Sequence, residues 1–228
     1  MKKLLVITAI VTMLSTTMFA QQLPGISARA TAGYTSKVVE FGKASNGAYT
    51  AGADLAWQSF SVGVLTYNDL AVSPFSAKLN RVDLTAAYKL FSTLADVNVG
   101  AAYVHVNNAG KFDFSGHWRP FVTVSKGFYA VTAAYDTQSR LSNIEGKLFT
   151  SVETPLVGVS LVPAVFVGYT DVNDALPKTV KEIKYTNAYF GAGADVTYKW
   201  LSVGGLVLHD GQTNHTTGVW HAYATYKF

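Results

Sequence analysis

The stretch Thr217-Gly-Val-Trp-His-Ala-Tyr-Ala-Thr-Tyr-Lys-Phe228 carries the pattern that predicts the fold of this chain. One alternate set of its residues is apolar, with aromatic residues at both ends: Trp220, Ala222, Ala224, Tyr226 and Phe228. The other set is mostly polar: Val219, His221, Tyr223, Thr225 and Lys227. Because successive side chains of a β-strand point to opposite faces, we expect a strand with one apolar and one polar face. Such a strand suits a wall with lipid outside and a polar or watery interior.

The same stretch resembles the terminal strand of Gram-negative outer-membrane β-barrels, which ends in Phe with apolar residues at alternate positions before it. Aromatic residues at both ends of the apolar face also match the girdles that such barrels place at the two membrane interfaces. The resemblance implies three partners: outer-membrane lipids, lipopolysaccharide, and the barrel-assembly machinery, which would bind through Phe228. It also implies location in the cell outer membrane.

The start of the chain agrees with this interpretation. Met1-Lys2-Lys3 is basic, residues 4–14 are almost wholly apolar, and residues 15–20 lead to a cleavage site before Gln21. This is the pattern of a secretory signal peptide, and its apolar run is too short to span a bilayer as a helix. We therefore predict a cleaved signal peptide at 1–20 and a single transmembrane β-barrel domain at 21–228.

Composition argues against several classes of function. Charged residues are only 14% of the chain, whereas an ordinary globular domain has about 25%. A protein with much of its outer surface in lipid needs less charge. Without residues 1–20 the net charge is +2 and no basic block remains, so we expect no nucleic-acid partner. The absence of cysteine excludes disulfides and Cys-ligated metals.

Segments with a period of two recur along the whole of residues 26–228. We count twelve, at 26–37, 47–57, 59–67, 80–90, 94–106, 117–126, 128–137, 143–153, 157–170, 185–198, 200–209 and 217–228. Their connections alternate between tight turns and longer loops. The tight turns lie near Gln58, 91–94, 126–128, 154–156 and 199–201, and the loops at 38–46, 68–79, 107–116, 138–142, 171–184 and 210–216. The prediction is an all-β fold, a transmembrane antiparallel up-and-down barrel of about twelve strands.

A membrane-embedded sheet must close on itself, because lipid offers no partner to the backbone groups of a free edge. In a closed barrel almost all the charged strand residues fall on the inward face. The predicted pore-lining residues are Arg81, Asp83, Lys89, Asp96, Arg119, Asp136, Lys147, Asp195, His221 and Tyr223. With turns at 91–94 and 126–129, Lys89 lies directly opposite Asp96, and Arg119 opposite Asp136.

Two interpretations of these inward charges stay open. They are either structural ladders that fill and stiffen the interior, or the lining of a pore that sorts solutes by charge. Positive and negative residues nearly balance, which argues against strong ion selectivity. The inward aromatic residues Tyr67, Phe121, Phe149, Phe166, Tyr189 and Tyr223 more often pack a small barrel than form a ligand slide.

Catalytic and metal sites are weakly supported. No Gly-x-Ser-x-Gly or His-Glu-x-x-His motif occurs, and His209, Asp210 and His215 are only a loose rim group. In loop 171–184, Asp171, Asn173 and Asp174 could supply oxygens to calcium, but such loops usually stay solvated. The loop could also fold inward and narrow the mouth. We predict no enzyme activity, no cofactor and no metal.

The chain is also similar to small porins of Gram-negative bacteria. The residues that carry this resemblance are Ala32-Gly-Tyr-Thr-Ser-Lys37, Tyr49-Thr-Ala-Gly-Ala-Asp-Leu-Ala-Trp57 and Phe60-Ser-Val-Gly-Val-Leu65. Twelve strands lie between the filled eight-stranded barrels and the open barrels of sixteen. The resulting hypothesis is a channel for passive diffusion of small polar solutes. The alternatives are a side-chain-plugged structural or surface-interaction barrel and, third, an outer-membrane barrel enzyme.

Overall fold

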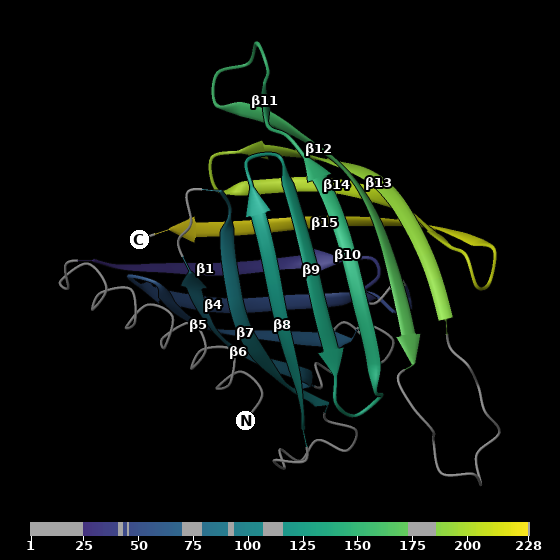
Figure 1. The fold of residues 1–228 in the computed structure, drawn as a ribbon. Coiled ribbons are helices and arrows are strands. Elements are labelled where there is room, and N and C mark those ends of the chain that lie inside the picture. The colour runs from purple at the N-terminus through teal and green to yellow at the C-terminus, as the bar shows by residue number, and fades with distance from the viewer. Residues whose placement is uncertain are drawn as a thin grey trace, which may run out of the picture.

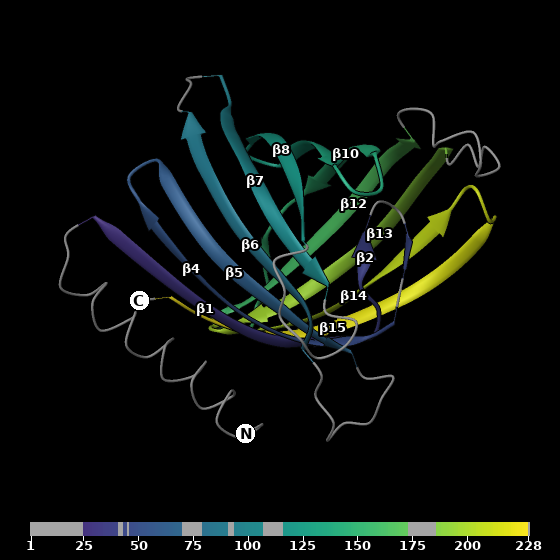
Figure 2. The ribbon, with the colours of Figure 1, turned by 90° about the horizontal axis from the view of Figure 1, so that it is seen from below.

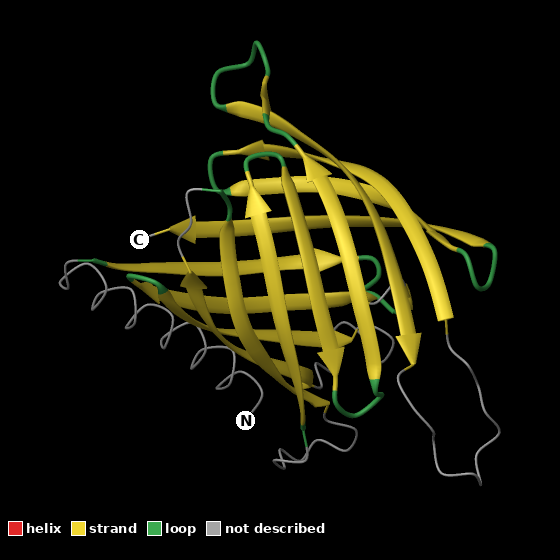
Figure 3. Ribbon diagram, in the orientation of Figure 1, coloured by secondary structure: helices red, strands yellow, loops and turns green. Residues whose placement is uncertain are grey.

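The computed structural model describes residues 25–40, 43–44, 46–69, 79–90, 94–106, 116–172 and 186–227. Residues 1–20 and Phe228 lie outside these ranges, so the signal peptide and the role of Phe228 stay predictions. The described residues are strands and their connections (Figure 3). No helix in this part of the chain is long and apolar enough to cross a membrane.

Twelve long strands confirm the predicted all-β fold, each within a few residues of its predicted position. They are β1 (Ile26–Thr35), β4 (Ala48–Trp57), β5 (Phe60–Asp69), β6 (Leu79–Leu90), β7 (Asp96–Val106), β8 (His117–Lys126), β9 (Tyr129–Asp136), β10 (Leu141–Phe149), β12 (Val159–Val172), β13 (Thr186–Tyr198), β14 (Leu201–Asp210) and β15 (His215–Lys227). Three strands have two residues each: β2 (Val39–Glu40), β3 (Lys43–Ala44) and β11 (Val152–Glu153).

The twelve long strands form one closed antiparallel barrel (Figures 1 and 2). Each pairs with the long strands before and after it in the chain, and β1 pairs with β15 to complete the ring. Every long strand therefore has two hydrogen-bonded neighbours. This arrangement leaves no open edge, which is the condition for a sheet to lie in lipid.

The two faces of the wall differ as the alternation predicts. Large apolar side chains are exposed on the outward face, among them Leu84, Val165 and Phe190, which are 45%, 50% and 58% exposed. In a water-soluble domain such residues would be mostly buried. Polar side chains of the inward face, by contrast, include fully buried Thr170 and Asn187. The wall is therefore apolar towards its surroundings and polar towards its interior.

The connections divide the barrel into two ends. At the turn end, where β1 begins and β15 finishes, β4 and β5 join through residues 58–59 and β8 and β9 through 127–128. At the opposite end, called here the loop end, β1 and β4 join through residues 36–47. Two predicted loops of this end are only four-residue turns, at 137–140 and 211–214.

One turn and one register also differ from the sequence prediction. Nine residues, 150–158, separate β10 from β12, instead of a tight turn at 154–156, because β11 extends the pairing with β12. Lys89 pairs with Asn98 and not directly with Asp96, since the β6–β7 connection is longer than expected. A register shift of two residues leaves every side chain on its predicted face.

Inward aromatic rings cover glycines of the neighbouring strand. Tyr189 covers Gly168 and Phe166 covers Gly191, and a Cβ atom at either glycine would overlap the ring. The two rings also contact each other, with centroids 6.4 Å apart. At these positions the aromatic residues pack against the wall, as expected for a small barrel.

Candidate functional site

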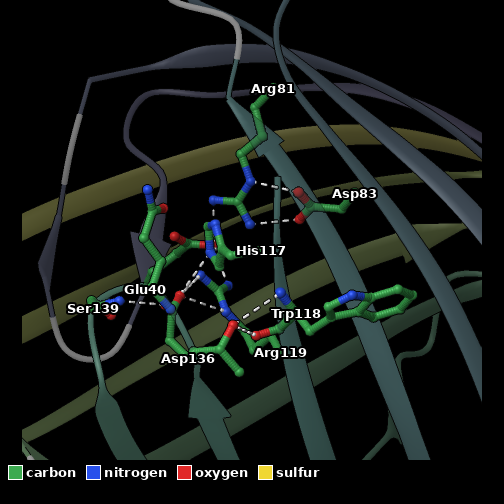
Figure 4. Close-up of polar contacts among 10 residues, drawn as sticks. Glu40, Arg81, Asp83, His117, Trp118, Arg119, Asp136 and Ser139 are labelled. Atoms are coloured by element: carbon green, nitrogen blue, oxygen red, sulfur yellow. Dashed lines mark hydrogen bonds and ion pairs between the residues drawn. The ribbon is translucent and has the colours of Figure 1, made fainter. Parts of the chain in front are cut away.

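A hairpin at the loop end contacts a cluster of inward charged residues. These residues belong to strands that are not the ones the hairpin connects. The hairpin is residues 36–47, with β2 and β3 paired through Val39–Ala44 and Glu40–Lys43. It connects β1 to β4, yet Glu40 forms ion pairs with Arg81 of β6 and Arg119 of β8 (Figure 4). Since both arginines occupy inward positions, the hairpin crosses the interior of the barrel at this end.

The two guanidinium groups converge on one oxygen atom. Arg81 Nη1 lies 2.5 Å from Glu40 Oε1, and Arg119 Nη1 lies 3.1 Å from the same oxygen. These are charge-assisted hydrogen bonds, which are stronger than bonds between neutral groups. The loop carboxylate therefore joins two arginines from different strands.

Strand aspartates fix the other edge of each guanidinium. Arg81 donates from Nε and Nη2 to the two oxygens of Asp83, at 2.6 and 2.5 Å. Arg119 donates from Nε and Nη2 to Asp136 Oδ2, at 3.3 and 2.8 Å. Each arginine thus directs one nitrogen, Nη1, towards the hairpin, and its bonds to the aspartate fix that direction.

Asp136 is the most constrained member of this cluster. Its Oδ2 lies 2.9 Å from His117 Nε2, and its Oδ1 accepts from the backbone N–H groups of Gln138 and Ser139 at 3.0 and 2.9 Å. The side chain is 5% exposed. These bonds close the turn after β9 and attach the charged cluster to the rim of the wall. Trp118, next along β8, points away from the cluster on the outward face (Figure 4).

A cavity of about 750 Å³ runs along the inner face from the turn end to the hairpin. Its lining includes Arg29 and Thr225 near the turn end and Lys37 and Val39 of the hairpin. Along β1 the distance from Arg29 to Thr35 is roughly 20 Å at the usual rise per strand residue. The cavity therefore extends along much of the barrel and meets the hairpin at the loop end.

The wall formed by β10, β12 and β13 is packed with side chains at the loop end. Tyr189 Oη donates to Asn143 Oδ1 at 3.0 Å and lies 2.9 Å from Glu145 Oε2. Thr170 Oγ1 donates to the same Asn143 oxygen at 2.8 Å. These groups satisfy one another and are buried, and none of them lines the cavity.

The remaining predicted pore-lining residues also take inward positions. Lys89 Nζ lies 2.8 Å from Asp96 Oδ2, and Lys147 Nζ lies 5.9 Å from the ring centre of Phe149. Their role in lining a pore stays a prediction.

Asp195, His221 and Tyr223 form a second inward group. His221 Nε2 lies 2.6 Å from Asp195 Oδ1, although the strand β14 separates them. The contact forms over Gly204, where any side chain would collide with the aspartate. The His221 ring stacks on Tyr223 with a centroid distance of 4.9 Å.

The side chains of His209 and Asp210, which the sequence places in a loose group at the rim, do not come together in the structure. The two side chains leave β14 on opposite faces, and His209 Nδ1 lies 3.1 Å from Thr216 Oγ1. Asp210 instead accepts the N–H groups of Gln212 and Thr213 and closes the turn at 211–214. Within the described ranges no group of three or more His, Asp or Glu side chains is placed to hold a metal ion. Most of loop 171–184, including Asn173 and Asp174, lies outside the described residues.

Glu40 is the functional candidate that sequence reasoning missed. It lies in a loop, so no strand period assigns it a face. The β-branched pair Val38-Val39 before Phe41-Gly42 hints at a small hairpin. Nothing in that spacing indicates which part of the wall the hairpin meets.

No family model and no curated protein sequence matches the chain. Solved structures of outer-membrane channels are similar in fold. The porin NanC aligns with 11% identity over 88% of this chain and 100% of that chain, with a TM-score of 0.53. An outer-membrane channel from Pseudomonas putida F1 aligns with 12% identity over 90% of this chain and 97% of that one, with a TM-score of 0.51. The chain thus has the fold of porin-like outer-membrane barrels.

Proposed function

We propose that the protein is an outer-membrane channel through which small hydrophilic solutes diffuse passively. The observation that carries this proposal is the cavity of about 750 Å³, which follows the inner wall from Arg29 to the hairpin inside a closed barrel. An inward face with Arg81, Asp83, Arg119, Lys147, Asp195 and Tyr223 gives a polar path. The fold that this chain shares with NanC and the P. putida channel agrees with such a role.

The outward face supports location in the outer membrane. Its exposed valine, leucine and phenylalanine side chains match acyl chains, and aromatic residues lie near its two ends, such as Tyr49 and Trp57, the second and last residues of β4. Outer-membrane lipids and lipopolysaccharide would then surround the barrel, after export by the signal peptide at 1–20 and assembly through Phe228.

Planar-bilayer recording tests the proposal. The chain purified without residues 1–20 is folded in detergent and added to a planar lipid bilayer in potassium chloride. We expect discrete current steps of narrow-channel size. Heat-unfolded protein is the control. Correctly folded barrel, verified by circular dichroism, that gives no steps at all would overturn the proposal.

A side-chain-plugged barrel is the second candidate function. It is favoured by the packed group of Asn143, Thr170 and Tyr189 and by the hairpin that crosses the loop end. Such a barrel would act through its outer surface or its loops and would carry no current. The same recording separates the two, because removing the hairpin contact by Glu40→Ala raises the conductance only of a channel.

A further inference from the structure

We propose that Arg81 and Arg119 form a binding site for the carboxylate group of a small solute, and that Glu40 occupies this site until a solute displaces it. The inference rests on the proposed channel function and names the class of solute: small carboxylates. Glu40 is then an exchangeable occupant of the site, and its contacts with the two arginines are not fixed structural ion pairs.

The geometry is that of a preformed site for a carboxylate oxygen. Arg81 Nη1 and Arg119 Nη1 point at one place, 2.5 and 3.1 Å from Glu40 Oε1. Asp83 and Asp136 hold the far edge of each guanidinium, so the two nitrogens keep their directions when the occupant leaves. An oxygen of any carboxylate placed there would meet the same two donors.

Exposure identifies Glu40 as the carboxylate that can leave. Its side chain is 34% exposed, whereas those of Asp83 and Asp136 are 13% and 5% exposed. Asp83 and Asp136 belong to long wall strands, while Glu40 belongs to a strand of two residues. Moving Glu40 needs a change only in the hairpin, whereas moving either aspartate needs a change in the barrel wall.

The net charge of the cluster is the same before and after one solute carboxylate replaces Glu40. Two arginines face three carboxylates, with His117 beside Asp136. While Glu40 is in place, a second anion would add negative charge to a cluster that already holds more carboxylates than arginines. When Glu40 leaves, two arginines and two aspartates remain, and one solute carboxylate restores the original balance. A neutral solute would not restore the charge that the cluster loses with Glu40.

The cavity reaches neighbours of the site on both the hairpin and the wall. Lys37, Val38 and Val39, which precede Glu40 on the hairpin, line the same cavity as Tyr67, whose ring lies under the Arg81 guanidinium at 4.9 Å. The arginines keep 14% and 16% of their side-chain surface exposed. Displacing Glu40 breaks its two ion pairs with β6 and β8, so binding of the solute also frees the hairpin from that wall.

Propionate and its neutral isostere propionamide test the proposal. Their binding to the detergent-folded chain is measured by NMR titration, and their effect on channel current in a planar bilayer. Glu40→Gln keeps the shape of the occupant and removes its charge, so we expect propionate to bind on the order of tenfold tighter, about 1.4 kcal/mol. Glu145→Gln is the matched control, because Glu145 is an inward carboxylate at the same end that contacts Tyr189 and neither arginine. It leaves propionate affinity unchanged.

A second arm of the experiment tests the arginines themselves. Arg119→Gln, added to Glu40→Gln, removes one of the two donors, and we expect the gained affinity to disappear. Propionamide binds no variant measurably. Equal propionate affinity in wild type and Glu40→Gln, or an equal gain in Glu145→Gln, would overturn the carboxylate site.

The two readouts separate this inference from the channel proposal. Current steps that propionate does not change, together with no binding in the titration, reject the carboxylate site and leave the channel intact. Tight propionate binding by a folded barrel that carries no current rejects the channel and leaves the site.

Discussion

Leu84 and Thr85 are neighbours in the middle of β6 that face opposite sides of the wall. Leu84 is outward and 45% exposed, while Thr85 lines the interior cavity. Replacing each in turn by arginine places the same charge at the same height, once in lipid and once in the lumen. We expect Leu84→Arg to destabilise the folded barrel strongly and Thr85→Arg to have little effect.

The size of the effect follows from the position of Leu84. It is the sixth residue of the twelve-residue strand Leu79–Leu90. At about 3.4 Å per residue it lies roughly 17 Å along the strand from Leu79. With a strand tilt of about 40°, this is roughly 13 Å in height, close to half of an apolar band about 25 Å tall. An outward arginine at that depth costs roughly 2–4 kcal/mol. The folding equilibrium then falls by about 30-fold to 1,000-fold.

The assay is equilibrium folding into phospholipid vesicles over a guanidinium chloride series, followed by tryptophan fluorescence. Thr85→Arg is expected to stay within about 1 kcal/mol of wild type, since lumen substitutions are tolerated. Equal losses for the two variants, or a larger loss for Thr85→Arg, would contradict the assignment of the faces.

Two further predictions concern the interior. Gly168→Ala forces a Cβ atom into the ring of Tyr189 and should lose about 1–3 kcal/mol in the same vesicle assay. Gly146→Ala is its control, because the nearest atom to the added carbon is a backbone oxygen 4.0 Å away, and a comparable loss there would refute the packing explanation. Lys89→Ala breaks the ion pair with Asp96, whose partners are 36% and 44% exposed, and should cost less than about 1 kcal/mol. A loss of several kcal/mol would mean that this pair is structural.

The barrel was predictable from sequence because a strand with lipid on one side must alternate outward apolar residues with inward polar ones. The run from Arg81 to Leu90 alternates charged or polar residues with apolar ones except at Ala87, and both faces came out as expected. The connections were less predictable, because turns carry no such alternation. Residues 137–140 form a short turn that ends with Arg140 at a φ of 54°, a conformation that its sequence does not reveal.

The charged cluster was predictable only where strand pairing determines it. Arg119 and Asp136 were expected to face each other because a short turn fixes the register of β8 and β9, and they form an ion pair of 2.8 Å. Lys89 and Asp96 also interact, although their strands are shifted by two residues. Glu40 lies 79 residues before Arg119, and no periodicity relates a loop hairpin to the wall that it contacts.

A cysteine scan along β6 tests the central claim most directly, because the chain has no native cysteine. Single cysteines from position 81 to 90 are labelled with a nitroxide in lipid vesicles, and collisions with oxygen and with a water-soluble nickel complex are measured. Oxygen accessibility should peak at the even positions and nickel accessibility at the odd positions, with a period of two. Profiles without that period, or with the two phases exchanged, would contradict a barrel that turns its apolar face to lipid and its polar face inward.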